Sequence, residues 1–282
     1  MKIRFWGVRG SIASPGPETA GVGGNTSCVE IVAGGERIIL DAGTGLRRLG
    51  DAMLREGADS ATLLLSHVHW DHIQGLPFFA PAYLHATKLH IFGGTDGRHT
   101  LREKLGRQMT EPHFPVQLDD LPAALLTREV KPGQTFEVGG ARVTVARLNH
   151  PGGANAYRIE HEGSVVVFAT DTEHYACLDP VLSKLARNAD VLIYDAQYTP
   201  EEYAGAVGPP KVGWGHSTYV AAAELASAAG VGKLVLFHHD PQRSDAAVAD
   251  IEARARALFA DSVAAREGQT IALGSATSER AA

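Results

Sequence analysis

Short apolar runs, separated by turns rich in glycine and proline, dominate the pattern of the chain. Runs of this length, rich in β-branched and aromatic residues, predict strands between the turns. The predicted strand segments are 2–7, a hairpin within 26–43 that turns at 33–36, and then 62–69, 88–94, 134–150, 155–171, 190–198 and 233–239.

Helical spacing of apolar residues occurs between these runs. Residues 45–57 place Leu46, Leu49 and Met53 on one face and stop at Gly57, as a helix does. Three further segments are expected to contain helix: 73–84, which begins as a helix and breaks at its prolines, 96–109, and 244–260.

A fifth helix is predicted at 217–229, with Ser217 as its N-cap. The proline-rich segment 111–135 is predicted to be irregular and to cover a site. Together these elements predict one α/β domain, 1–282, in which two β-rich halves pack face to face with helices outside.

Composition places the chain among globular proteins with a sizeable core, since 44% of it is hydrophobic and 21% is charged. The formal net charge of −6 argues against a protein that binds nucleic acid without regard to sequence. No nucleic-acid polymer is therefore expected as a partner, whereas a small anionic substrate is compatible with a metal that supplies local positive charge.

Targeting features and cysteines favour a cytoplasmic protein. The N-terminus has no apolar signal core, and no run of about 18 apolar residues predicts a membrane span. Cys28 and Cys177 are too few for a disulfide framework, and both are expected to be buried thiols in a reducing compartment. A homodimer is left open, because no feature of the sequence defines an interface.

The most informative stretch is 63–75, LLLSHVHWDHIQG, which carries His67, His69, Asp71 and His72 after an apolar run. Residues i and i+2 of a strand point to the same face, so His67 and His69 can bind one ion together. Asp71 and His72 follow in the turn, where they can reach a second ion. One strand end thus offers half of a two-metal site.

Further ligands are expected where other buried strands end, because sites gather at strand ends in α/β proteins. Three positions qualify: His150 after 142–149, Asp171 after 164–170, and His238 after 233–237. His238 is preferred to the adjacent His239 because it directly ends the apolar run. Nitrogen and oxygen ligands without thiolate favour zinc, with manganese or iron as alternatives.

The stretch His67-Val68-His69-Trp70-Asp71-His72 matches the His-x-His-x-Asp-His signature of the metallo-β-lactamase fold superfamily. The resemblance covers nearly the whole chain and implies a four-layer αββα sandwich with two divalent metal ions at one edge. It also implies the ligand sets. The first ion takes His67, His69 and His150, the second takes Asp71, His72 and His238, and Asp171 bridges both.

The stretch Gly213-Trp214-Gly215-His216-Ser217-Thr218 resembles the His-Ser-Thr element of the phosphodiesterase branch of this superfamily. That branch includes tRNase Z and the cyclic phosphodiesterase of phosphonate breakdown. The resemblance implies that His216 contacts the phosphate and protonates the leaving oxygen, with Asp195 as its carboxylate partner. A carboxylate raises the pKa of an imidazole and sets its tautomer, as a general acid requires. The expected catalytic residues are His216, Asp195 and Asp71, the last of which is also a ligand.

Substrate contacts are expected from two other regions. The N-terminal loop resembles the same branch, and its Arg9 and Asn25 are candidates to meet a phosphate and to position the loop. The segment 93–130 offers Arg98, Arg102, His113 and Phe114, of which His113 is retained as a substrate-binding candidate. His239 and Asp240 are expected to support the neighbouring ligand.

The interval between His150 and Asp171 bears on the substrate. The tRNase Z enzymes usually insert a long arm for tRNA there, whereas 21 positions leave room for one hairpin, since 171 − 150 = 21. We therefore expect a small phosphodiester, such as a cyclic nucleotide or a cyclic sugar phosphate. Two alternatives remain: a hydrolase of carboxylic esters, lactones or β-lactams on the same fold, and a metal protein that binds a nucleotide without cleaving it.

Overall fold

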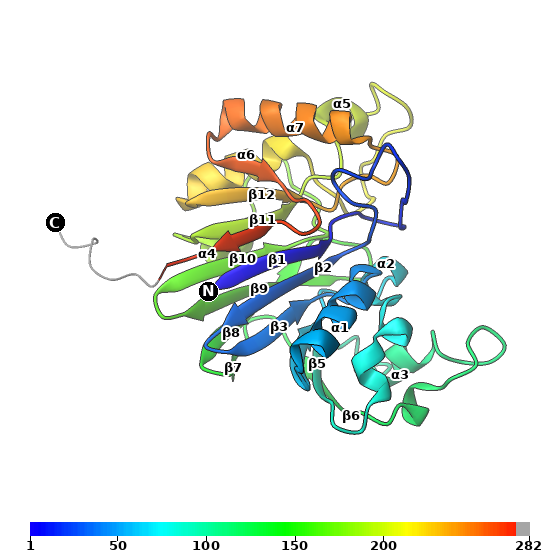
Figure 1. Ribbon diagram of the computed structural model, residues 1–282. Helices are drawn as coiled ribbons and strands as arrows, with labels where there is room; N and C mark the ends of the chain where they lie inside the picture. Colours follow the sequence, from blue (N-terminus) through cyan, green and yellow to red (C-terminus); the bar gives the residue numbers. More distant parts are fainter. Residues whose placement is uncertain (275–282) are drawn as a thin grey trace.

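The computed structural model describes residues 1–274 and contains two seven-stranded mixed sheets that pack face to face (Figure 1). The first sheet has the order β14 (Thr270–Ala272), β1 (Lys2–Gly7), β2 (Cys28–Ala33), β3 (Glu36–Leu40), β4 (Ser60–Leu64), β5 (Lys88–Gly94) and β6 (Ala124–Val130). The second has the order β13 (Ser262–Ala264), β12 (Lys233–Phe237), β11 (Val191–Asp195), β10 (Ser164–Ala169), β9 (Ala154–His161), β8 (Ala141–Leu148) and β7 (Thr135–Val138).

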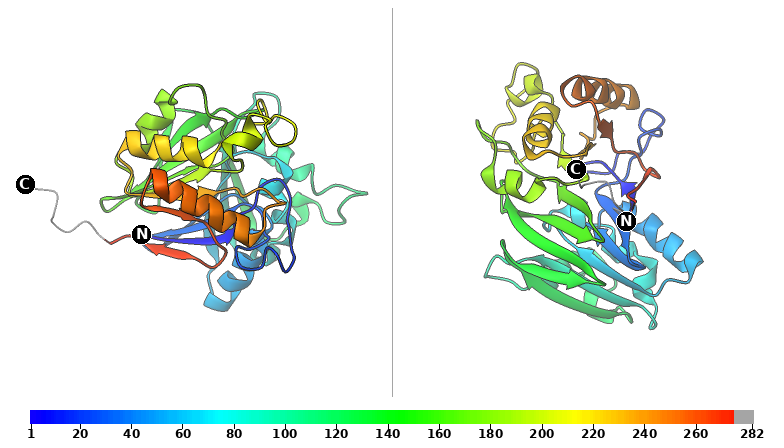
Figure 2. Two further views of the ribbon diagram at one scale, coloured as in Figure 1. Left: turned by 90° about the horizontal axis from the view of Figure 1, so that it is seen from above. Right: turned by 90° about the vertical axis from the view of Figure 1, so that its left-hand side faces the viewer.

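Helices cover the outer faces of both sheets. Figure 2 (left) shows α1 on one side and α6 and α7 on the other, with the strands between them, so the expected αββα sandwich is confirmed. The helices are α1 (Gly45–Glu56), α2 (Trp70–Ile73), α3 (Leu101–Gly106), α4 (Pro180–Ala186), α5 (Pro200–Tyr203), α6 (Tyr219–Ala229) and α7 (Asp245–Leu258). No helix among residues 1–274 is long and apolar enough to cross a membrane.

Three apolar clusters correspond to these layers. Residues such as Phe5, Ile31, Phe168 and Phe237 form the core between the sheets. The other two clusters lie between the first sheet and α1, and between the second sheet and α4, α6 and α7. Alternation along the strands sends every second side chain to each core.

Strand direction places the candidate ligands together. Strands β3, β4 and β5 are parallel in the first sheet, and β10, β11 and β12 are parallel in the second. Strand β8 is antiparallel to β9, and β9 to β10, so β8 ends at the same edge as β10. The chain leaves both sheets at one shared edge with Asp41, His67, His150, Asp171 and His238.

Several element boundaries differ from the prediction. Thr218, not Ser217, is the N-cap of α6, because its side chain accepts from the Ala221 N–H. The predicted helix at 96–109 is limited to α3 by a capping box at Thr100. Residues 73–84 form two 3₁₀ turns, Leu76–Phe78 and Ala80–Tyr83, preceded by α2.

The segment 111–135 contains a strand that was not predicted. Strand β6 is the edge of the first sheet and is half-exposed. Because it contains the polar residues Thr127, Arg128 and Glu129, its sequence lacks the apolar run that predicts a strand. Four other elements were also missed because they are short: α4, α5, β13 and β14. Cys28 is buried as expected, but Cys177 is exposed.

One hydrogen bond between the sheets generates a prediction. The buried Tyr157 hydroxyl of β9 donates to the Leu65 carbonyl at the end of β4, at 2.6 Å. We expect Tyr157→Phe to lower the free energy of unfolding by about 1–3 kcal/mol, because a buried carbonyl loses its donor. Urea denaturation measures this. Tyr83→Phe is the matched control, since Tyr83 makes a similar bond to the Pro77 carbonyl at a position 38% exposed. An equal loss in both variants would contradict the role of burial.

Candidate metal centre and its phosphate side

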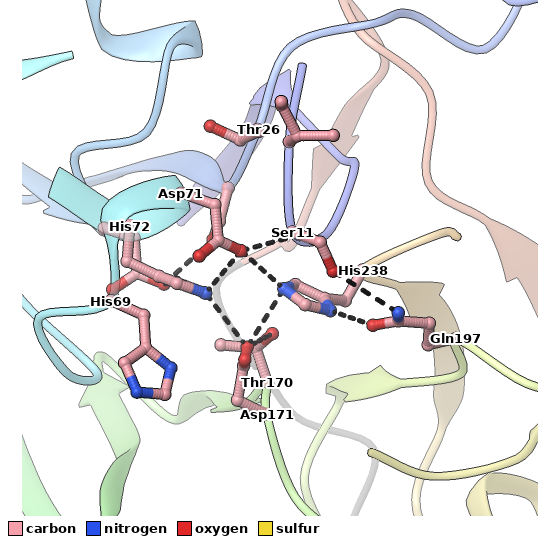
Figure 3. Close-up of polar contacts among 12 residues, drawn as sticks. Ser11, Thr26, His69, Asp71, His72, Thr170, Asp171, Gln197 and His238 are labelled. Carbon is pink, nitrogen blue, oxygen red and sulfur yellow. Dashed lines mark hydrogen bonds and ion pairs between the residues drawn. The ribbon is translucent and has the colours of Figure 1, made fainter. Parts of the chain in front are cut away.

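Two carboxylates and two imidazoles meet at the centre of the shared edge (Figure 3). The Nε2 atom of His72 lies 3.1 Å from Asp71 Oδ2 and 3.2 Å from Asp171 Oδ1. The Nε2 atom of His238 lies 3.3 Å and 3.2 Å from the same two oxygens. Asp71, His72 and His238 thus form one compact donor group, with Asp171 against it.

A second donor group lies on the other side of Asp171. His67, His69 and His150 each offer a ring nitrogen, and these nitrogens lie within 4.8 Å of one another. Asp171 Oδ2 is 3.8 Å from the Nε2 atoms of both His67 and His150. Asp171 therefore directs one oxygen toward each group, as a bridging carboxylate would. His69 is exposed, so the site opens on its side.

The donor atoms are suited to metal ions, because two of them have no hydrogen-bond partner among their neighbours. The buried Nε2 atoms of His67 and His72 make no hydrogen bond. Nitrogen and carboxylate oxygen atoms without sulfur suit zinc, manganese or iron. Two groups of this kind, sharing one carboxylate, can hold two ions.

The surroundings favour the ligating form of two of these groups, Asp171 and His67. Burial raises the pKa of Asp171, but His238, His72 and His67 outweigh it and hold that pKa well below its usual range. Burial, and then His72, lower the pKa of His67 well below its usual value, so this imidazole stays neutral with a lone pair available. An ionised carboxylate and a neutral imidazole are the forms that bind metal.

Backbone strain is concentrated at the same strand ends. Asp41, Asp171 and His238 have φ values of 61°, 54° and 61°, in the left-handed region that non-glycine residues rarely adopt. Each residue directly follows its strand or lies one residue beyond it, so the left-handed turn redirects the side chain into the site. Strain of this kind persists where the surrounding structure overdetermines it.

A layer of partners orients the ligands, and the sequence did not reveal it. Asp41 Oδ2 is 2.7 Å from His72 Nδ1, and Asp41 also accepts from Ser27 and from Ser66. Gln197 Oε1 accepts from His238 Nδ1 at 2.9 Å. The Gly215 carbonyl lies 2.9 Å from His150 Nδ1. Each contact occupies one ring nitrogen and leaves the other for a metal.

Asp41 and Gln197 were missed because their importance depends on partners far away in the chain. Both nonetheless follow buried strands, β3 and β11, and that position was the signal available in sequence. Glycine at position 10 is also required here. A Cβ on Gly10 would lie 2.4 Å from the His238 ring, so the N-terminal loop can pass close to the site only without a side chain.

His216 and Asp195 form the expected pair. His216 Nδ1 lies 2.8 Å from Asp195 Oδ2, and the ring is 8% exposed at the side of the site. Burial lowers the pKa of His216, but the charge and hydrogen bond of Asp195, and then Asp171 and Asp71, raise it to about 9. The contact with Asp195 occupies Nδ1 and leaves Nε2 for a substrate.

Glu173, which was not predicted, holds the loop that carries His216. Its carboxylate accepts from the backbone N–H groups of Gly213 and Gly215 and from the Tyr203 hydroxyl. The loop 213–216 is thereby tied to the residues that follow Asp171.

The expectation for Arg9 is corrected by the structure. Its side chain is fully buried, and its guanidinium donates to the carbonyls of Gly23, Asp240 and Arg243. It therefore holds the N-terminal loop and is not free to bind phosphate. Asn25 positions the loop, as expected: its carbonyl accepts from the Val8 and Arg9 N–H groups. Its side-chain amide donates to Glu267, so a substrate contact by Asn25 stays a prediction.

The segment 93–130 does not bring its candidates into the donor groups. Arg102 pairs with Asp119, and Phe114 packs edge-on against Phe78. Arg98 and His113 are exposed, so a substrate contact by His113 stays a prediction.

The choice between His238 and His239 follows from the geometry. His238 lies in the donor group, whereas His239 Nε2 donates to the Ala265 carbonyl at 3.0 Å. Burial, and then Arg9, Arg243 and Arg266, lower the pKa of His239 to about 3. His239 and Asp240 support the site through backbone groups: the Gly10 N–H donates to the His239 carbonyl, and Arg9 donates to that of Asp240.

Comparison with known proteins agrees with this geometry. The family model described as "Beta-lactamase superfamily domain" matches residues 36–239. The chain belongs to this superfamily. It is also 32% identical over 262 residues to a ribonuclease Z of Mycobacterium sp. (strain KMS), covering 87% of this chain and 88% of that protein.

Two solved structures share the fold. The metallo-β-lactamase fold protein YhfI from Bacillus subtilis has a TM-score of 0.73 and 20% identity, covering 96% of this chain and 98% of that one. A diphosphatase from the PhnP family has a TM-score of 0.69 and 16% identity, covering 97% and 98%.

These findings confirm the expected family and the general activity. This member of the superfamily is a metal-dependent hydrolase that is related in sequence to ribonuclease Z. The clusters of histidine and aspartate at the strand ends are suited to divalent metal.

The contact between Asp41 and His72 generates a prediction. We expect Asp41→Asn to lower the affinity for divalent metal by about 10–100-fold, because His72 loses the carboxylate that orients its ring. Isothermal titration with zinc and metal analysis of the purified protein would measure the change. Asp179→Asn is a suitable control, because Asp179 caps α4. Unchanged affinity in Asp41→Asn would contradict the orienting role.

Proposed function

We propose that the chain is a two-ion phosphodiesterase, with zinc as the first choice of metal and manganese or iron as alternatives. The single observation that carries the proposal is the hydrogen-bonded His216–Asp195 pair beside a double donor group. In this proposal His67, His69 and His150 would hold one ion, Asp71, His72 and His238 would hold the other, and Asp171 would contribute to both. When bound, the two ions lower the pKa of water and stabilise negative charge on phosphate oxygens.

His216 has the part of the general acid. Its Nε2 proton is transferred to the leaving oxygen of the ester, while Asp195 keeps Nδ1 protonated and stabilises the cation before transfer. Asp71 contributes to the reaction as a metal ligand. The Ser11 N–H donates to its Oδ2 at 2.8 Å and so keeps this carboxylate turned into the site. A hydrolase of carboxylic esters or lactones has less need of such a proton donor at this place.

For the substrate we propose a small phosphodiester, of which cyclic nucleotides and cyclic sugar phosphates are the simplest. The interval between His150 and Asp171 is taken up by β9, β10 and a tight turn, which leaves no arm there for a folded RNA. The second candidate is cleavage of RNA, which the similarity to ribonuclease Z favours.

Two wider expectations belong to the same proposal. We take residues 1–282 as one catalytic domain, because the core between the sheets draws on strands from both halves of the chain; residues 275–282 lie outside the described part. The cytoplasm stays the proposed compartment, where an exposed Cys177 thiol would remain reduced.

The first prediction of this proposal concerns hydrolysis itself. The zinc-loaded protein is expected to hydrolyse bis(p-nitrophenyl) phosphate and at least one cyclic nucleotide, and His67→Ala/Asp171→Ala is expected to abolish both activities. The double variant removes one ligand of the first group and the bridging carboxylate. Release of p-nitrophenol and metal content would be measured together. Full activity in the double variant, or faster turnover of a lactone than of any phosphodiester, would contradict the proposal.

The second prediction tests the general acid. In His216→Gln we expect cleavage of a cyclic nucleotide to slow by about 10²–10⁴-fold, because its alkoxide leaving group needs a proton. Cleavage of bis(p-nitrophenyl) phosphate should slow far less, since p-nitrophenolate leaves without one. His239→Gln is a control on a neighbouring histidine outside the donor groups. Equal losses on both substrates would assign His216 to binding instead of proton transfer.

A further inference from the structure

A groove of about 900 Å³ begins at the metal centre and has no part in the chemistry described above. It lies against strands β8 and β9 and helix α4, and its lining starts at Asn149 and His150. Ligand sites commonly have volumes of about 300–1,000 Å³. The groove is therefore large enough for a part of the substrate beyond the scissile bond.

The groove carries free positive charge. Arg142 and Arg147 of β8 and Lys184 of α4 line it, and their side chains make no hydrogen bond or ion pair within residues 1–274. The other charges of the lining are already engaged. Arg158 is paired with Glu160, and Asp179 accepts from the first N–H groups of α4. Unpaired cations around a hollow attract an anionic ligand.

The cations of β8 are widely spaced. Arg142 and Arg147 are five residues apart, which corresponds to about 17 Å at a rise of 3.4 Å per residue, and this odd spacing sends their side chains to opposite faces of the strand, so Arg147 meets the groove from its edge. They are too far apart to bind a single phosphate together. A second hollow of about 230 Å³, lined by His67 and His69, shares Arg147 with the groove. Arg147 therefore lies between the metal centre and the more distant cations.

The lining also has apolar and aromatic surface. Val181 is 53% exposed and Tyr175 is 51% exposed, and both line the groove. An aromatic ring beside spaced cations suits a nucleotide, because a base can stack while its phosphates meet the cations. A cyclic mononucleotide has one phosphate and would leave most of the groove empty.

We propose that this groove binds a second phosphate and its nucleoside, so that the preferred substrate is a linear nucleotide phosphodiester with a phosphate beyond the scissile bond. The inference rests on the proposed phosphodiesterase function and names its substrate class. Arg147 meets the nearer part of this extension, and Arg142 and Lys184 meet the farther part. Hydrolysis still occurs at the metal centre, and the groove contributes binding alone.

The test compares three dinucleotides that differ by one terminal phosphate: ApA, pApA and ApAp. With the zinc-loaded enzyme, one of the two phosphorylated forms is expected to have a kcat/KM about tenfold above that of ApA, a size consistent with a few exposed contacts between cation and phosphate. Arg142→Gln/Arg147→Gln/Lys184→Gln should bring this ratio close to one. The control Lys2→Gln/Arg55→Gln/Lys88→Gln removes three exposed cations from the first sheet and α1, and it should keep the ratio.

Each outcome has a separate meaning. A ratio near one in the unaltered enzyme, or a ratio that survives in the groove variant, overturns the inference. Light scattering measures the oligomeric state of both proteins. If the unaltered enzyme is a dimer and the groove variant is not, the groove binds a second copy of the chain, and the inference is overturned. Hydrolysis of bis(p-nitrophenyl) phosphate is measured in parallel. If that activity is present, failure concerns the groove alone, and if it is absent, the proposed function itself fails.

Discussion

Two buried carboxylates, Asp71 and Asp171, are held within 3.1–3.3 Å of the same two imidazole nitrogens, and the rest of the structure depends on this arrangement. Burying charge is costly unless an opposite charge or a metal compensates it. Here the nearest groups are the Nε2 atoms of His72 and His238, whose lone pairs face the carboxylates when their Nδ1 atoms are bound to Asp41 and Gln197. A pair of divalent ions would satisfy both requirements, because it would neutralise the carboxylates and use the lone pairs.

The sandwich makes this concentration of donors possible. Parallel strands from both sheets end at the same edge, so residues as distant in sequence as His72 and His238 reach one centre (Figure 3). The left-handed backbone at Asp41, Asp171 and His238 turns each side chain inward. Asp41, Gln197 and the Gly215 carbonyl then hold the rings, so that the donors do not depend on the ions alone for their orientation.

The proposed proton donor and the groove lie on different sides of the metal centre. His216 and Asp195 lie on the side of β11 and α6, where a proton can be delivered. The groove along β8 lies on the side of His150, where free cations extend away from the metals. In the proposed function, the proton donor and the substrate groove therefore reside on different elements.

The sequence by itself determined the donors and most of the strands. The donors could be predicted because they form local patterns in the sequence. These patterns are the spacing His67-Val68-His69-Trp70-Asp71-His72 and the single donors that follow apolar runs at 150, 171 and 238. The apolar runs also predicted the sandwich, because period-two burial is local too. By contrast, the strand β6 was taken for a loop, since its exposed edge has little apolar signal.

Only the tertiary structure decided the partners. Arg9 resembled a phosphate ligand, yet its guanidinium is enclosed by the carbonyls of Gly23, Asp240 and Arg243. Asp41 resembled the end of an ordinary strand, yet it orients His72 from 31 positions away. His238 and His239 were adjacent candidates that a left-handed turn at His238 separated. A side chain's role depends on which groups surround it, and that is fixed by contacts between residues distant in sequence.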